Sequence, residues 1–189
     1  QKPFKVFKII NYLIKIYNIN YISLINFMFN PNINDLIDNV AFKLIDSKRT
    51  VSVVESCTGG FLSTCLTSIS GASKYFKGSV VAYNNSVKEN LLNISPNFII
   101  DHGVVSRHVV ELMAINIKSN FNTHFGLATT GYLDNANSTS KKPPSLHAWI
   151  AVSSNNYVKS EHIYLHKSRK ENIYMVSEAL LRLFVKQII

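Results

Sequence analysis

A short run of β-branched residues that ends at a pair of glycines constrains the fold of this chain more than any other segment. Residues 50–54 (TVSVV) are typical of a buried strand. Gly59 and Gly60 follow, and residues 61–69 then show the apolar spacing of a helix, which we expect to stop at Gly71. The segment therefore predicts a strand, a tight turn and a helix, the unit from which α/β folds are built.

The same alternation of strands and helices continues along the chain. An amphipathic helix is predicted over residues 34–45, with Asn34 or Asp35 as its cap. The other predicted elements are a strand at 79–83, helices at 86–92 and 106–122, strands at 125–130, 147–153 and 160–166, and a helix at 171–186. Because the last strands follow one another without a helix, we predict a three-layer α/β domain with a mixed, largely parallel sheet flanked by helices.

Composition and charge narrow the classes of function. The 189 residues suit about one domain, and 47% hydrophobic with 16% charged residues excludes wholesale disorder. Four lysines among residues 1–27 supply four of the nine net positive charges. The remaining basic residues are scattered singly, without the arginine clusters and interleaved aromatic residues of nucleic-acid interfaces. We therefore expect no nucleic-acid partner.

Residues 1–27 differ in composition from the rest of the chain. Their asparagines interrupt the apolar stretch, so a membrane-spanning helix is not expected. No small-residue cleavage site follows, so a secretory signal is not expected either. We interpret these residues as translated sequence upstream of a true start at Met28, which leaves residues 28–189 as the domain. A basic amphipathic surface helix is the alternative interpretation. In that case residues 1–27 would bind the chain to a membrane surface, which is a further functional hypothesis.

The cysteines and histidines indicate neither a disulfide framework nor a metal site. Two cysteines cannot build the several bridges of a small secreted domain, which favours a reducing compartment and hence the cytoplasm. The six histidines show no metal-ligand spacing. We therefore expect no metal and no cofactor.

The strongest chemical signal lies in residues 55–60 (ESCTGG). Side chains at the carboxyl end of such a strand face the ligand crevice of an α/β sheet, and the start of the following helix attracts an anion. Ser56, Cys57 and Thr58 are three candidate nucleophiles side by side. A Ser/Thr helix cap with glycines for the turn is the structural alternative for the same residues.

Several segments together resemble a known family. ESCTGG after TVSVV, then SGASKYFKGSVVAYNNSVKENLLNIS, HGVVS and WIAVS resemble, in order and spacing, the C-terminal domain of the CinA (competence/damage-inducible) family in its stand-alone form. The resemblance runs from about residue 34 to the C-terminus. It implies an amidohydrolase that converts nicotinamide mononucleotide to nicotinate mononucleotide and ammonia, and it implies a homo-oligomer.

The family pattern assigns catalytic roles to three residues. Ser56 matches the nucleophile, and Tyr83 and Lys88 match the family's tyrosine and lysine. A lysine whose pKa is lowered by burial can take the serine proton and return it to the departing ammonia. Without the resemblance, Tyr83 would be interpreted as a core aromatic residue and Lys88 as a solvated helix residue.

The same pattern assigns substrate binding to residues around the nucleophile. Thr58, Gly59 and Gly60 would present hydroxyl and backbone donors to the substrate. Arg169 lies near the family's Gly-Asp-Arg segment and would clamp the nucleotide phosphate, although the preceding Gly-Asp is absent. Thr130 and Gly131 are further candidates, because they remain in register with the family.

The chain departs from the family pattern directly after Gly131. The family continues with Ile-Ala-Gly-Pro and later Lys-Pro-Val-Gly-Thr, whereas residues 132–145 of this chain lack those glycines and retain only Lys142 and Pro143 in register. Loss of glycine removes positive-φ conformations and close backbone approach, so we expect a reshaped pocket wall. The alternative function is therefore a catalytically weak or inactive nucleotide-binding homologue in which the start of the helix holds phosphate.

Overall fold

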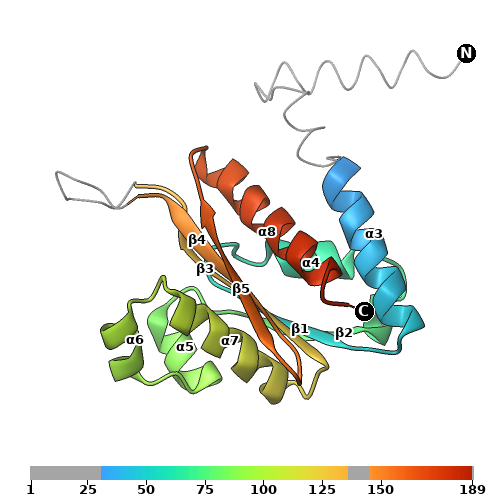
Figure 1. Cartoon of the computed structure of the whole chain (residues 1–189), viewed down its shortest axis with the longest axis horizontal. Helices are drawn as coiled ribbons and strands as arrows, with labels where there is room; N and C mark the ends of the chain where they lie inside the picture. The colour runs from blue at the N-terminus through green and yellow to red at the C-terminus, as the bar shows by residue number, and fades with distance from the viewer. Residues whose placement is uncertain (1–30, 136–144, 189) are drawn as a thin grey trace, which may run out of the picture. The chain divides into compact units, whose positions relative to one another are not determined.

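The computed structural model (Figure 1) describes residues 31–135 and 145–188. The chain divides into two units, Gln1–Asp35 and Leu36–Ile189, and the sheet lies in the second. The predictions for residues 1–27, for the start at Met28, and for Lys142 and Pro143 lie outside the described residues.

A five-stranded sheet in the order β2-β1-β3-β4-β5 forms the middle layer (Figure 1). Its strands are β1 (Val51–Glu55), β2 (Phe76–Val81), β3 (Phe125–Tyr132), β4 (His147–Ser153) and β5 (Val158–Tyr164). β1 pairs in parallel with β2 and β3, whereas β4 pairs antiparallel with β3 and β5. Within the described residues four strands run one way and β4 opposes them, which confirms the predicted mixed, largely parallel sheet.

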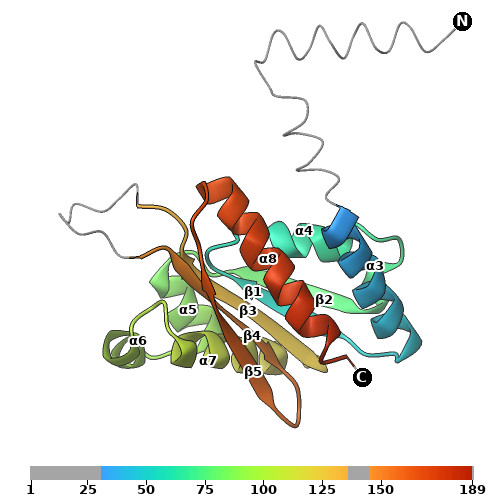
Figure 2. The same ribbon diagram turned by 45° about the horizontal axis from the view of Figure 1, so that its top comes forward.

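Helices cover both faces of the sheet. They are α3 (Pro31–Asp46), α4 (Phe61–Thr67), the 3-10 helix η1 (Ala72–Lys74), α5 (Asn85–Leu92), α6 (Pro96–His102), α7 (Arg107–Asn120) and α8 (Arg169–Val185). α4 and α8 lie on one face, and α5, α6 and α7 lie on the other (Figures 1 and 2). The three predicted layers are confirmed. None of the helices described is long and apolar enough to cross a membrane.

The core lies mainly between α7 and the sheet. The residues of α7 that repeat at helical spacing are fully buried: Val109, Val110, Met113, Ala114 and Ile117. A Cβ at Gly126 of β3 would collide with the Ala114 carbonyl oxygen. Glycine at this position therefore allows α7 to approach β3 closely.

Several predicted boundaries were wrong. The first described helix begins at Pro31, so Asn34 and Asp35 lie inside it and do not cap it. The helix after Gly60 ends at Thr67 rather than near Gly71. β2 ends at Val81, so Tyr83 follows the strand instead of belonging to it.

One helix was missed and another begins earlier than predicted. α6 starts after Ser95, whose hydroxyl accepts the Phe98 N–H, with proline in the first turn. α8 begins at Arg169 because Ser168 and Glu171 form a capping box. This cap places Arg169 at the first position of the helix, directly over the end of the sheet that carries the site.

Candidate functional site

The predicted site residues lie where β1, β2 and β3 end. Ser56 follows β1, Lys88 lies in the helix that follows β2, and Thr130 belongs to the last part of β3. Parallel strands bring their carboxyl ends to one edge of a sheet, where α/β proteins bind ligands. The structure therefore brings these residues to this edge of the sheet, and their role as a site stays a prediction.

The carboxylate of Glu55 fills the start of α4. It is fully buried, and Oε2 accepts the Thr58 hydroxyl (2.7 Å) and the amides of Gly60 (3.0 Å) and Leu62 (3.1 Å). Oε1 accepts both the amide (2.8 Å) and the hydroxyl (2.6 Å) of Ser63. A negative charge here also complements the helix dipole. The protein's own carboxylate thus occupies the helix start that the sequence suggested for a substrate anion.

Two consecutive glycines make the turn between Glu55 and α4. Gly59 has φ 62° and Gly60 has φ 101°, both in the left-handed region that favours glycine. A Cβ at Gly59 would meet nothing within 4 Å, so the backbone angle rather than space requires glycine there. The turn alone accounts for both glycines, and their roles in substrate binding stay predictions.

Of the three neighbouring nucleophile candidates, Ser56 has the free hydroxyl. The Thr58 hydroxyl donates to Glu55 and also contacts the Thr129 hydroxyl at 2.9 Å. Burial raises the pKa of Cys57 to about 12, so its thiol stays protonated near neutrality. Ser56 is half-buried, its N–H donates to the Thr129 carbonyl (3.1 Å), and its Oγ has no hydrogen-bond partner among the described residues. Thr129, which the sequence analysis missed, positions this segment.

Lys88 is buried beside the end of β1. Its side chain is 1% exposed, and Nζ donates to the Ala82 carbonyl at 2.8 Å. Ala82 in turn donates its N–H to the Glu55 carbonyl at 2.7 Å, next to Ser56 in the chain. Burial lowers the pKa of Lys88, while the neighbouring Cys57 raises it by less. The alternative interpretation of Lys88 as a solvated helix residue was wrong.

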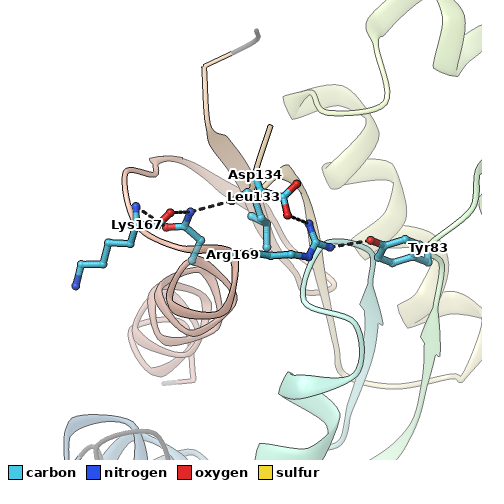
Figure 3. A network of polar contacts seen from close by, with 6 residues as sticks. Tyr83, Leu133, Asp134, Lys167 and Arg169 are labelled. Carbon is cyan, nitrogen blue, oxygen red and sulfur yellow. Dashed lines mark hydrogen bonds and ion pairs between the residues drawn. The ribbon is translucent and has the colours of Figure 1, made fainter. Parts of the chain in front are cut away.

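Arg169 links three segments above this end of the sheet, as Figure 3 shows. Its Nη2 donates to the Tyr83 hydroxyl (2.7 Å), and its Nη1 forms an ion pair with Asp134 Oδ2 (3.1 Å). Tyr83 is 63% exposed, so the alternative that made it a core aromatic residue was wrong. Burial raises the pKa of Cys57, and the charge of Arg169 lowers it by a smaller amount.

A buried asparagine holds the segment after β3 against the start of α8. Asn172 Nδ2 donates to the carbonyls of Leu133 (2.9 Å) and Lys167 (2.8 Å), and its Oδ1 accepts the Lys167 N–H (3.2 Å) (Figure 3). This arrangement fixes Asp134 beside Arg169. Neither Asn172 nor Asp134 was predicted from the sequence, since no local spacing connects them to Arg169.

Thr130 and Gly131 have structural contacts of their own. The buried Thr130 hydroxyl donates to the Val104 carbonyl at 2.9 Å. A Cβ at Gly131 would lie 2.7 Å from Ala148 Cβ and 2.9 Å from the His147 carbonyl oxygen, so glycine is needed for strand packing. Their roles in substrate binding stay predictions.

No metal centre is evident in the described part of the chain. Residues 31–135 and 145–188 hold no group of three or more His, Cys, Asp or Glu side chains that would bind an ion. Both cysteines, Cys57 and Cys65, are buried free thiols.

Comparison with known proteins identifies the family. The model of the CinA C-terminal domain matches residues 33–188. The chain belongs to the CinA family. Protein MG115 of Mycoplasma genitalium is 37% identical over 145 residues, which cover 77% of this chain and 92% of that protein. The CinA-like protein of Amoebophilus asiaticus is 35% identical over 155 residues, which cover 82% of this chain and 37% of that protein.

The chain thus spans about a third of the length of the longer CinA-like proteins that it matches. Solved structures show the same CinA fold. CihA from Agrobacterium tumefaciens superposes with a TM-score of 0.77 at 24% identity, covering 82% of this chain and 94% of that one. ComA from Klebsiella pneumoniae gives a TM-score of 0.76 at 20% identity, covering 82% and 96%. The resemblance to CinA drawn from the sequence motifs is confirmed.

Proposed function

We propose that this CinA-family chain hydrolyses the carboxamide of nicotinamide mononucleotide, giving nicotinate mononucleotide and ammonia, without a metal or a cofactor. The observation that carries the proposal is the free Ser56 hydroxyl directly after β1, together with the buried Lys88, which is linked through Ala82 to the Glu55 carbonyl next to Ser56 in the chain. Hydrolysis of an unactivated amide needs a nucleophile and a group that moves its proton. A lysine whose pKa is lowered by burial supplies the second function without histidine.

The reaction follows from these two side chains in two stages. Neutral Lys88 takes the proton of Ser56 as Oγ attacks the carboxamide carbon. The C–N bond then breaks, Lys88 returns the proton to the departing nitrogen, and ammonia leaves an ester on Ser56. Water, deprotonated by Lys88, attacks that ester and releases the carboxylate while Ser56 regains its proton.

Arg169 is the residue proposed to hold the phosphate of the nucleotide. It is partly exposed, and its guanidinium is oriented from two sides, by Asp134 and by the Tyr83 hydroxyl. Guanidinium offers five N–H donors, so it can keep these contacts and still bind phosphate oxygens. Glu55 closes the start of α4 to anions, which favours Arg169 over that helix as the phosphate anchor.

The two free cysteines favour the cytoplasm, and the resemblance to the family supports a homo-oligomer, an assembly that we include in the proposal. It does not enter the chemistry above, because the residues of the mechanism all come from one chain.

The test is ammonia release from nicotinamide mononucleotide by the full-length chain. We expect turnover that is lost in Ser56→Ala and retained in Ser73→Ala, since Ser73 is exposed and lies outside the site. Thermal melting of both variants checks that they fold. Nucleotide-induced stabilisation without ammonia release would instead support the nucleotide-binding homologue, and retained turnover in Ser56→Ala would overturn the assignment of the nucleophile.

A further inference from the structure

Two hollows open at the end of the sheet opposite the candidate site, where β1 and β3 begin. One, of about 420 Å³, lies beside the end of α8 and is lined by residues that include Arg49, Tyr157 and Lys186. The other, of about 560 Å³, lies beside the end of α7 and is lined by residues that include Lys118. His124 and Asn155 line both hollows, so the two are adjacent.

The charged residues that line these hollows all carry positive charge. Arg49, Lys118 and Lys186 contribute three cations, and no aspartate or glutamate is among the described residues lining either hollow. Arg49 lies over the ring of Phe125 at 5.8 Å, and Lys118 Nζ donates to the neutral Asn155 amide oxygen at 2.9 Å. The ion pairs of the described residues involve other arginines, namely Arg107, Arg169 and Arg182.

His124 adds an N–H donor to the lining of both hollows. Its Nδ1 accepts the Thr50 N–H at 3.1 Å, which places the hydrogen of the neutral ring on Nε2. The amide groups of Asn155 and Asn156 line the same space. Cations together with N–H donors are the groups that bind phosphate oxygens in proteins.

We propose that the two adjacent hollows together bind a small anion carrying at least two phosphate groups, of the class of inorganic pyrophosphate or a nucleoside diphosphate. The cations are divided between the two hollows, with Arg49 and Lys186 in one and Lys118 in the other, and a diphosphate carries two anionic groups that match this division. Each volume lies in the range of about 300–1,000 Å³ that is usual for small-ligand sites. This site is separate from the amidohydrolase site and does not depend on that assignment.

Two of these cations also lie near the ends of helices. Lys118 is in the last turn of α7, and Lys186 caps α8, where positive charge complements the exposed carbonyl groups. Such a role predicts an effect on stability, whereas the proposed site predicts an effect on binding. The experiment must therefore measure binding directly.

The test is calorimetric titration of the full-length chain with inorganic pyrophosphate, with adenosine diphosphate as a second probe. We expect pyrophosphate to bind the parent and to bind Arg49→Gln/Lys186→Gln at least tenfold more weakly. The control Lys77→Gln/Lys159→Gln removes the same charge from exposed residues outside the hollows and should bind within threefold of the parent. Tighter binding of the nucleotide than of pyrophosphate would identify a nucleoside diphosphate as the ligand, and equal binding would identify the diphosphate group alone.

Three outcomes would overturn the proposal. The first is that the parent binds neither probe. The second is that Lys77→Gln/Lys159→Gln weakens binding as much as Arg49→Gln/Lys186→Gln does. The third is that Arg49→Gln/Lys186→Gln leaves binding unchanged. Arg49→Lys keeps the charge and should retain binding within threefold, which separates lost charge from a damaged fold. Ser56→Ala should bind pyrophosphate as the parent does, so failure of the proposed deamidase would leave this result intact.

Discussion

The charged groups at the two ends of the sheet differ in their burial and in their bonding partners. At the carboxyl end of β1, Glu55 and Lys88 are buried and bonded to backbone groups. At the amino end, Arg49 and Lys186 line open hollows and form no ion pair within the described part of the chain. Burial lowers the pKa of Lys88, whereas Lys186 is exposed and Arg49 is half-buried, so that both keep their charge available to a ligand.

This comparison teaches that burial, rather than residue type, decides what a charged side chain does here. Lys88 and Lys186 have the same side chain, but Lys88 is buried, which lowers its pKa, whereas Lys186 is exposed. Lys88 therefore suits proton transfer, whereas Lys186 suits anion binding. Substitutions at the two ends of the sheet should therefore differ in the size of their effects and in the property, proton transfer or anion binding, that they change.

The largest effect is expected from Lys88→Met, which removes the base but keeps a side chain of similar length in the buried space. Loss of a positioned general base costs about 100- to 10,000-fold in rate. Ammonia release measures it, with Lys159→Met as an exposed control that should retain the parent rate. A Lys88→Met rate within threefold of the parent would show that Lys88 has no part in the reaction.

Glu55→Ala should produce the largest loss of stability. It leaves three amides and two hydroxyls at the start of α4 without their acceptor. We expect the free energy of unfolding to fall by roughly 3–5 kcal/mol, measured by urea denaturation. Glu161→Ala on the exposed face of β5 should change it by less than about 0.5 kcal/mol. A loss below about 1 kcal/mol for Glu55→Ala would contradict the account of this helix start.

Arg169→Gln should affect binding rather than folding. Removal of charge-assisted hydrogen bonds to phosphate should raise KM for nicotinamide mononucleotide about tenfold, with kcat within about threefold. The ion pair with Asp134 is partly exposed, so its loss should cost less than about 1 kcal/mol of stability. Arg182→Gln, which breaks a comparable pair elsewhere on α8, should leave KM unchanged. Equal KM values in both variants would exclude Arg169 as the phosphate anchor.

The smallest effect on folding is expected at the amino end of the sheet. Arg49→Gln/Lys186→Gln should change the free energy of unfolding by less than about 1 kcal/mol, because Lys186 is exposed, Arg49 is half-buried, and neither forms an ion pair among the described residues. Urea denaturation measures the change. A loss comparable to that of Glu55→Ala would mean that these cations hold the fold together, and the contrast between the two ends would disappear.

Local sequence signals predicted much of this fold. The strand at 147–153 has the predicted bounds, and Ser106 caps α7 as a serine before a helical pattern suggests. The segment before Phe61 was correctly placed between a strand and a helix. These features depend on neighbouring residues, which is why a single sequence reveals them.

The contacts that assemble the site depend on residues far apart in the chain and were not predictable in this way. Asp134 meets Arg169 across 35 positions, and Thr129 meets Thr58 across 71. The return of the Glu55 side chain to the start of α4 was missed although it is local, because a strand residue is not normally expected to act as a helix cap. The resemblance to the family supplied Lys88, whose burial the helical pattern alone did not reveal.

The protonation of Lys88 also couples to stability. Because burial lowers its pKa below the ordinary value of 10.5, the unfolded chain binds more protons than the folded chain between the two values. The contribution of Lys88 to the free energy of unfolding therefore increases as the pH rises from its lowered pKa to 10.5. Urea denaturation across this pH range should show the increase in the parent and not in Lys88→Met.

The most direct test of the central claim is the pH dependence of ammonia release from nicotinamide mononucleotide. The account requires neutral Lys88, so the rate should rise with pH and level off at a pKa below 10.5, and Lys88→Met should lack that rise. A parent rate that stays constant as the pH rises through the pKa of Lys88, or the same rise in Lys88→Met, would contradict the claim that buried Lys88 activates Ser56.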